Sequence, residues 1–304
     1  MAVAVPRART VSARTYLRIA TTSTFALFLV ITSGAFVRLT GSGLGCENWP
    51  RCGDKPYPEQ GFHAFVEFGN RMVALAGIVL TLVTVLAARR TAGLSGWGRS
   101  AAFGAFLVAV AQIPMGGITI ALDLHPLAVM THFLLGLAAF GLALIAALEA
   151  WSLRSGRAAA AGERWFRLFV SWAGLPACLA LVVTGAIVTA SGPHPGSSAS
   201  VHRLSYWSDS VYVHVRIAAA FGIGVLIVGW VLWRIRETYP GLIRIWAGLL
   251  VVLVAQAIVG EVQYRNGLPW GVVLVHVALA ASIWAFSLAL AFALWRPPAP
   301  LARK

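Results

Sequence analysis

The chain has 304 residues, of which 59% are hydrophobic and 11% are charged, and its formal net charge is +14. A soluble domain carries about 25% charged residues, so this composition excludes a protein with water on all sides and leaves no room for a sizeable soluble domain. The positive charge does not indicate a nucleic-acid partner, because an excess of Arg in a polytopic protein marks its cytoplasmic loops. We therefore predict an all-α integral membrane protein that contacts lipid and no nucleic acid.

Apolar stretches of about 20 residues, each long enough to cross a bilayer, recur along the whole chain. The first stretch follows an Arg-rich start and runs into Arg38 without a small-residue cleavage site. We therefore interpret it as a retained helix and not as a signal peptide. The eight predicted transmembrane helices cover residues 17–39, 62–88, 97–121, 126–148, 166–190, 209–233, 242–264 and 270–294.

The distribution of basic residues supports this count of helices. With the N-terminus in the cytoplasm, seventeen Lys and Arg residues lie in the predicted inner segments and four lie in the outer segments. Because basic residues accumulate in cytoplasmic loops, this asymmetry predicts a multi-pass protein of the cell membrane with both termini cytoplasmic.

The two halves of the chain share a sequence pattern. An offset of 144 residues places the run 111–116 on the run 255–260, and His132 on His276. The same offset places Asn70 on His214. Since each half begins inside and contains four helices, the pattern predicts a parallel internal repeat. We expect two pseudo-symmetric four-helix bundles, formed by residues 1–150 and 151–304.

Three histidines lie within predicted helices, near their outer ends. His214 and His276 each lie about one and a half turns inward, at similar depth in one bundle, as two axial ligands of a haem iron would. Alternatively, each hydrogen-bonds across helices and binds nothing. Asn70 lies opposite His132. This predicts a haem iron with one strong axial ligand, His132, and a weak or vacant position on the other side. The alternative is a degraded duplicate of the second site.

Several charged residues lie close to these positions. Glu67 and Asn70 share one helical face because they are three residues apart. Glu67 could exchange protons in a reaction or form a structural pair with Arg71. Arg38, Arg71 and Arg216 lie toward the outer surface, where guanidinium groups could pair with haem propionates or with lipid headgroups.

Cys46 and Cys52 flank a short segment in the first predicted outer loop. Close cysteines outside the cytoplasm usually form a disulfide, so we predict one here. A redox role and a purely structural role both remain open.

The sequence resembles the haem A synthase family over nearly its whole length. The resemblance rests on the run from Gly34 to Cys46, on Glu67-Phe68-Gly69-Asn70-Arg71 and on the helix histidines; these residues are His132, His214 and His276. The family has four helix histidines, and Asn70 replaces the first, as in an actinobacterial-type variant. The resemblance implies a role in making haem A for cytochrome oxidase.

The resemblance also implies site residues. His214 and His276 would hold a haem b cofactor, with Arg216 nearby, while His132, Asn70 and Arg71 would bind the substrate haem O. Glu67 would be the catalytic carboxylate in oxidation of the C8 methyl group to a formyl group, in sites toward the outer face. Implied partners are haem O synthase and the cytochrome oxidase assembly pathway.

Two other functions fit the same histidines. One is a non-catalytic di-haem b cytochrome that passes electrons from quinol, and the other is a haem carrier. The inequality of the two predicted sites favours an enzyme, because an electron carrier would more naturally keep both ligand pairs. The sequence is compatible with a homo-oligomer.

Overall fold

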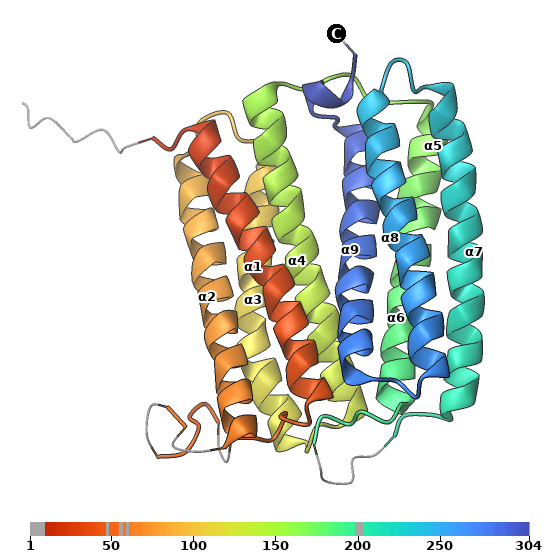
Figure 1. The fold of residues 1–304 in the computed structure, drawn as a ribbon. Coiled ribbons are helices and arrows are strands. Elements are labelled where there is room, and N and C mark those ends of the chain that lie inside the picture. The colour runs from red at the N-terminus through yellow and green to blue at the C-terminus, as the bar shows by residue number, and fades with distance from the viewer. Residues whose placement is uncertain (1–9, 47–48, 55–56, 59–60, 198–202, 304) are drawn as a thin grey trace, which may run out of the picture.

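The computed structural model describes residues 10–46, 49–54, 57–58, 61–197 and 203–303. Within this part of the chain, eight helical segments are long and apolar enough to cross a membrane, and no strand is present apart from one isolated bridge. The prediction of an all-α membrane protein with eight spans is therefore confirmed (Figure 1). The helices are α1 (Ala13–Leu39), α2 (Phe62–Arg90), α3 (Gly96–Ala121), α4 (Pro126–Ser155), α5 (Arg164–Phe169), α6 (Leu175–Ser191), α7 (Trp207–Arg234), α8 (Pro240–Arg265) and α9 (Trp270–Trp295).

Capping residues explain where several helices begin. The hydroxyl oxygens of Ser12 and Ser95 accept hydrogen bonds from the backbone N–H groups three residues ahead, at 3.1 and 3.0 Å. Pro126 and Pro240 occupy the first turns of α4 and α8, where a missing N–H costs nothing. Most helix boundaries in the structure fall within a few residues of the boundaries predicted from the sequence.

The fifth span is one continuous segment with an irregular centre. Between α5 and α6 lies a π-helical turn, Val170–Gly174, which ends two residues before Pro176. Proline lacks an N–H and its ring clashes with the carbonyl four residues earlier, so a widened turn removes the conflict without ending the helix.

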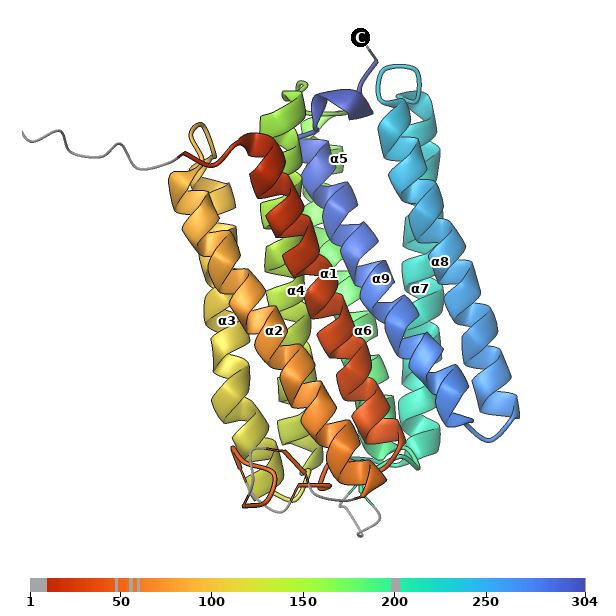
Figure 2. The same cartoon turned by 60° about the vertical axis from the view of Figure 1, so that its left-hand side comes forward.

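The eight spans form two groups of four by their packing contacts, and Figures 1 and 2 show the two groups side by side. Helices α1 to α4 form a ring in which each helix packs mainly against its two neighbours, and α6 to α9 form a second ring. In each ring α2 and α4, or α7 and α9, are therefore diagonal partners across the bundle centre. The rings meet where α9 packs on α1 and α4, and where α6 packs on α4.

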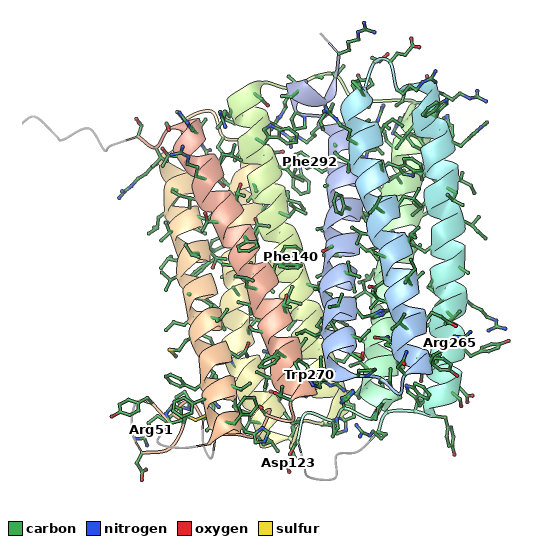
Figure 3. The ribbon with its side chains drawn as sticks, in the orientation of Figure 1. Arg51, Asp123, Phe140, Arg265, Trp270 and Phe292 are labelled. Carbon is green, nitrogen blue, oxygen red and sulfur yellow. A yellow bond between two sulfur atoms is a disulfide. The ribbon has the colours of Figure 1, made fainter. Side chains whose placement is uncertain are left out.

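The two ends of the molecule differ in what they carry. The described parts of both termini lie at one end, and the loop between Cys46 and Cys52 lies at the other, which we name the cysteine-loop end. Figure 3 shows Arg51, Asp123 and Arg265 at this end. Large apolar side chains such as Trp172 and Trp230 are exposed along the helices between the two ends, as expected for lipid contact.

At the terminal end, α4 is longer than predicted. The apolar run ends before Glu149, yet the helix continues to Ser155. Glu149 is fully buried, where it pairs with Arg157 and Arg296 and accepts a hydrogen bond from the Ser95 hydroxyl. These partners neutralise its charge, so the carboxylate does not end the helix.

Candidate functional site

The four residues that the sequence pattern matched lie at one depth. Asn70, His132, His214 and His276 each follow the start of their helix by six to eight residues, about 9–12 Å at 1.5 Å per residue. All four helices start at the cysteine-loop end. Each pair lies on diagonal helices of one ring.

A glycine on the neighbouring helix faces each of these four side chains. A Cβ added to any of the glycines would contact the facing residue, so glycine leaves space beside it. This feature of the repeat was missed in the sequence, although Gly116 and Gly260 end its two matched runs. The distances from the added Cβ are 3.9 Å for Gly34 to Asn70 Oδ1, 3.8 Å for Gly116 to His132 Cε1, 3.1 Å for Gly185 to His214 Cε1, and 3.4 Å for Gly260 to His276 Cε1.

The hydrogen bonds of the histidines bear on whether they can hold a haem. Nδ1 of His132 and Nδ1 of His276 are buried without a partner among the described residues. Only His214 makes a cross-helix bond, from Nδ1 to the Thr184 hydroxyl at 3.1 Å. Cross-helix hydrogen bonding therefore does not account for His132 and His276. Imidazoles that the protein leaves unpaired, each beside a glycine, fit the axial ligands of a haem.

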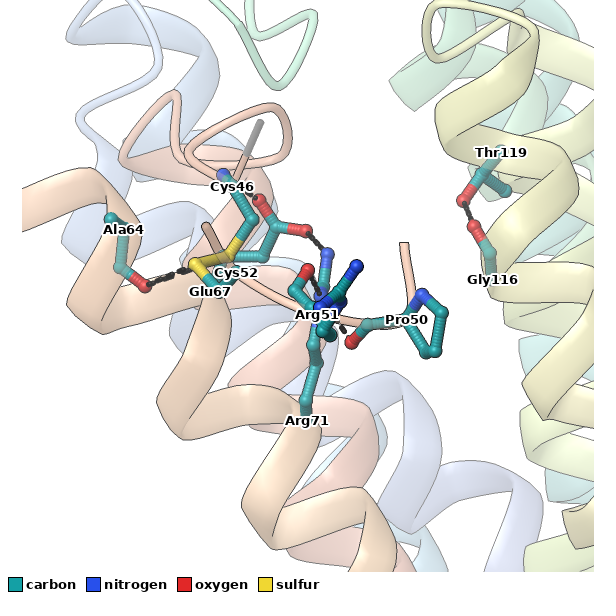
Figure 4. A network of polar contacts seen from close by, with 9 residues as sticks. All are labelled: Cys46, Pro50, Arg51, Cys52, Ala64, Glu67, Arg71, Gly116 and Thr119. Atoms are coloured by element: carbon teal, nitrogen blue, oxygen red, sulfur yellow. Dashed lines mark hydrogen bonds and ion pairs between the residues drawn. A yellow bond between two sulfur atoms is a disulfide. The ribbon is translucent and has the colours of Figure 1, made fainter. Parts of the chain in front are cut away.

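Glu67 is buried beside the cysteine loop, with 5% of its surface exposed. One carboxylate oxygen, Oε2, accepts the backbone N–H of Cys46 at 2.8 Å, and the other accepts the Arg71 guanidinium (Figure 4). The Glu67–Arg71 ion pair considered from the sequence is present. Both oxygens are thus fixed by protein donors, and the charge of Glu67 is balanced by Arg71.

Arg71 also anchors the loop. Its guanidinium donates to the carbonyl oxygens of Pro50 and Arg51 at 3.0 and 2.8 Å and stacks over the Trp49 ring, 4.8 Å from its centroid. Cys46 and Cys52 form the predicted disulfide. The loop is therefore held onto α2 at both of its ends.

Trp49 extends from this loop onto α3. A Cβ on Gly117 would lie 2.8 Å from the indole nitrogen of Trp49, and one on Gly116 would lie 3.8 Å from both Trp49 and His132. The indole therefore covers the α3–α4 side of the first ring, next to His132. Trp49 was not predicted as part of the site. The Trp-Pro pair between the two cysteines was the sequence feature that could have indicated its role.

The remaining arginines differ in their surroundings. Arg38 donates to the carbonyl oxygens of Thr189 and His194 at 2.7 and 3.0 Å. These donors link α1 to the second ring, and a contact of Arg38 with a propionate or a lipid headgroup stays a prediction. Arg216 stacks over Tyr212 on its own helix and donates to the Tyr212 carbonyl oxygen, so a propionate contact stays a prediction.

The fold and these contacts define an eight-helix membrane protein with diagonal pairs of candidate ligands in two helix rings. The family described as cytochrome oxidase assembly protein, COX15-CtaA, matches residues 17–288. The chain belongs to this family.

Curated relatives match over shorter segments. A heme A synthase of Symbiobacterium thermophilum is 34% identical over 125 residues, which cover 40% of each chain. A heme A synthase of Bacillus pumilus is 27% identical over 128 residues, 41% of this chain and 42% of the relative. A protoheme IX farnesyltransferase of Thermus thermophilus is 28% identical over 278 residues, 84% of this chain and 44% of the relative. The matched segments thus span about two fifths of the length of these relatives.

Proposed function

We propose that this protein is a haem A synthase, an oxidoreductase that converts the C8 methyl group of haem O to a formyl group. It acts in the cell membrane with both termini in the cytoplasm and the cysteine-loop end outside. The observation that carries the proposal is the inequality of the two rings. The second ring has a histidine on both diagonal helices, whereas the first has His132 opposite Asn70, with Glu67 one turn away.

The second ring holds the resident cofactor in this proposal. His214 and His276 bind haem b, and Arg216 pairs with a propionate. When bound, haem b would supply one-electron redox chemistry, which would carry electrons removed from the substrate in the methyl-to-formyl oxidation. The protein positions the two imidazoles from α7 and α9. The space left by Gly185 and Gly260 lets these imidazoles turn toward the bundle centre.

The first ring binds the substrate. His132 holds haem O from α4, and Asn70 and Arg71 contact it from α2. Glu67 is the proposed catalytic carboxylate. Cys46 and Arg71 hold its two oxygens, so the Glu67–Arg71 pair would act as a preorganised dipole toward positive charge developing at the methyl carbon. Trp49 covers this ring at the cysteine-loop end and excludes water from it.

The relatives support this proposal and its partners. Two of them are named heme A synthase. Another is named protoheme IX farnesyltransferase, and this chain matches 44% of it. Farnesylation of protohaem yields the haem O substrate, so we propose that haem O synthase supplies this protein and that cytochrome oxidase assembly consumes its product.

The test is haem extraction from membranes that express this chain together with a haem O synthase. Haem A should appear with the unaltered chain and fall by about a hundredfold in Glu67→Ala, as on removal of a preorganised charge. The matched control is Glu261→Ala, because Glu261 also pairs with an arginine four residues ahead but is exposed on α8. This variant should retain full haem A production.

Unchanged haem O with the unaltered chain would overturn the proposal. If the purified protein then binds two haems and passes electrons from a quinol, it is a di-haem cytochrome. If it binds haem and transfers no electrons, it is a carrier.

A further inference from the structure

Two of the four matched residues are hydrogen-bonded by a hydroxyl from the neighbouring helix. Ser33, which precedes Gly34 on α1, lies 2.7 Å from Asn70 Oδ1. Thr184, which precedes Gly185 on α6, lies 3.1 Å from His214 Nδ1. The same position thus contacts a different chemical group in each ring.

On α6, the hydrogen bonds of Thr184 determine the tautomer of His214. The single hydroxyl proton of Thr184 is donated to the Ala180 or Leu181 carbonyl oxygen, at 2.9 or 3.1 Å. Its oxygen is then an acceptor toward His214, so Nδ1 carries the proton. The lone pair of Nε2 is left free for a metal.

On α1, the outcome is reversed. The Ser33 hydroxyl has two possible acceptors for its proton. They are the Val30 backbone carbonyl oxygen at 3.1 Å and the side-chain oxygen Oδ1 of Asn70 at 2.7 Å. If its proton pointed at Val30, two oxygens would face each other at 2.7 Å without a proton between them. The proton therefore points at Asn70 Oδ1, which turns the Nδ2 group of Asn70 away from α1.

This Nδ2 group makes no hydrogen bond with the described residues. An amide nitrogen has no lone pair to offer iron, but it has two N–H donors. We infer that Ser33 positions Asn70 as a hydrogen-bond donor to a small anionic or oxygen ligand opposite His132, so that a first-ring haem has only one protein ligand. This inference rests on the proposed function, because it requires haem in the first ring.

The test is electron paramagnetic resonance and absorption spectroscopy of purified ferric protein loaded with two haems, titrated with azide. One haem should be low-spin and the other high-spin, and azide should bind the high-spin haem alone. Asn70→Leu removes the donor at similar size and should weaken azide binding about tenfold, and Ser33→Ala should weaken it about threefold. Asn70→His should make both haems low-spin and abolish the response to azide.

Thr32→Val is the matched control, because within the described part of the chain the Thr32 hydroxyl bonds only the Phe28 carbonyl oxygen of its own helix. It should leave both spin states and the azide affinity unchanged. Two low-spin haems in the unaltered protein would overturn the inference and leave the proposed function standing. An unaltered azide affinity in Ser33→Ala would overturn the positioning role of Ser33. A limit of one haem per chain would overturn the proposed function and this inference with it.

Discussion

Single substitutions at the second-ring histidines test the smallest unit of the site. Because both imidazoles are proposed to bind one iron, His214→Ala or His276→Ala should each remove most of the low-spin haem b, a loss of about tenfold or more. The measurement is the absorption spectrum of purified protein, with haem content determined per chain. His125→Ala, at the start of α4, is the control and should retain haem b. Full low-spin absorbance in either variant would contradict the assignment.

At the scale of single residues, the sequence singled out polar residues that interrupt an apolar helix, and it did not single out the residues that pack around them. The three histidines, Asn70 and Glu67 were predicted as site residues because polar groups within a membrane helix are costly and therefore informative, and their roles stay predictions. Trp49 and Ser33 were not, because an aromatic residue in a loop and a small hydroxyl in a helix are common. Their contacts arise from tertiary packing that no local pattern encodes.

The end of α4 offers a test at the scale of an element. Glu149 is fully buried between Ser95, Arg157 and Arg296, so Glu149→Gln should leave two cations without their shared anion. We expect a loss of about 2 kcal/mol in the free energy of unfolding, since both arginines retain some contact with water. Thermal unfolding in detergent measures it. Glu261→Gln, in an exposed pair, should change stability by less than about 0.5 kcal/mol. Equal stability of the two variants would show that the buried cluster contributes nothing.

Helix positions were predictable from the sequence, and their irregularities were not. Apolar runs placed all eight spans because the thickness of the bilayer sets their length. The extension of α4 depends on Arg157 and Arg296, which lie outside that helix, and the contact with Arg296 is distant in sequence. The π turn before Pro176 has a local cause, but proline could equally have ended the helix there.

The junction of the two rings tests the whole molecule. Arg38 donates to the Thr189 carbonyl near the C-terminal end of α6, where a cation is favourable. Arg38→Met should therefore lower stability by about 1 kcal/mol and reduce haem A severalfold, while second-ring haem b is retained. Arg18→Met, on the exposed surface of α1, is the control. Loss of haem b in parallel with haem A would show that Arg38 supports the second ring itself.

The number of spans could be inferred from the sequence, because it depends on apolar runs repeated along the chain. The way in which the rings meet, with α9 against α1 and α4, could not. These helices are apolar on nearly every face, so periodicity does not distinguish a side that contacts lipid from one that contacts another helix.

The glycines beside the four matched residues bear on how such a protein can diverge after duplication. Each leaves space in which one ligand residue can replace another without repacking of its neighbours. Asparagine and histidine codons differ by a single nucleotide, so the first ring can gain or lose a second iron ligand in one mutational step. In the proposed function, position 70 is therefore where one substitution changes how many protein ligands a first-ring haem has.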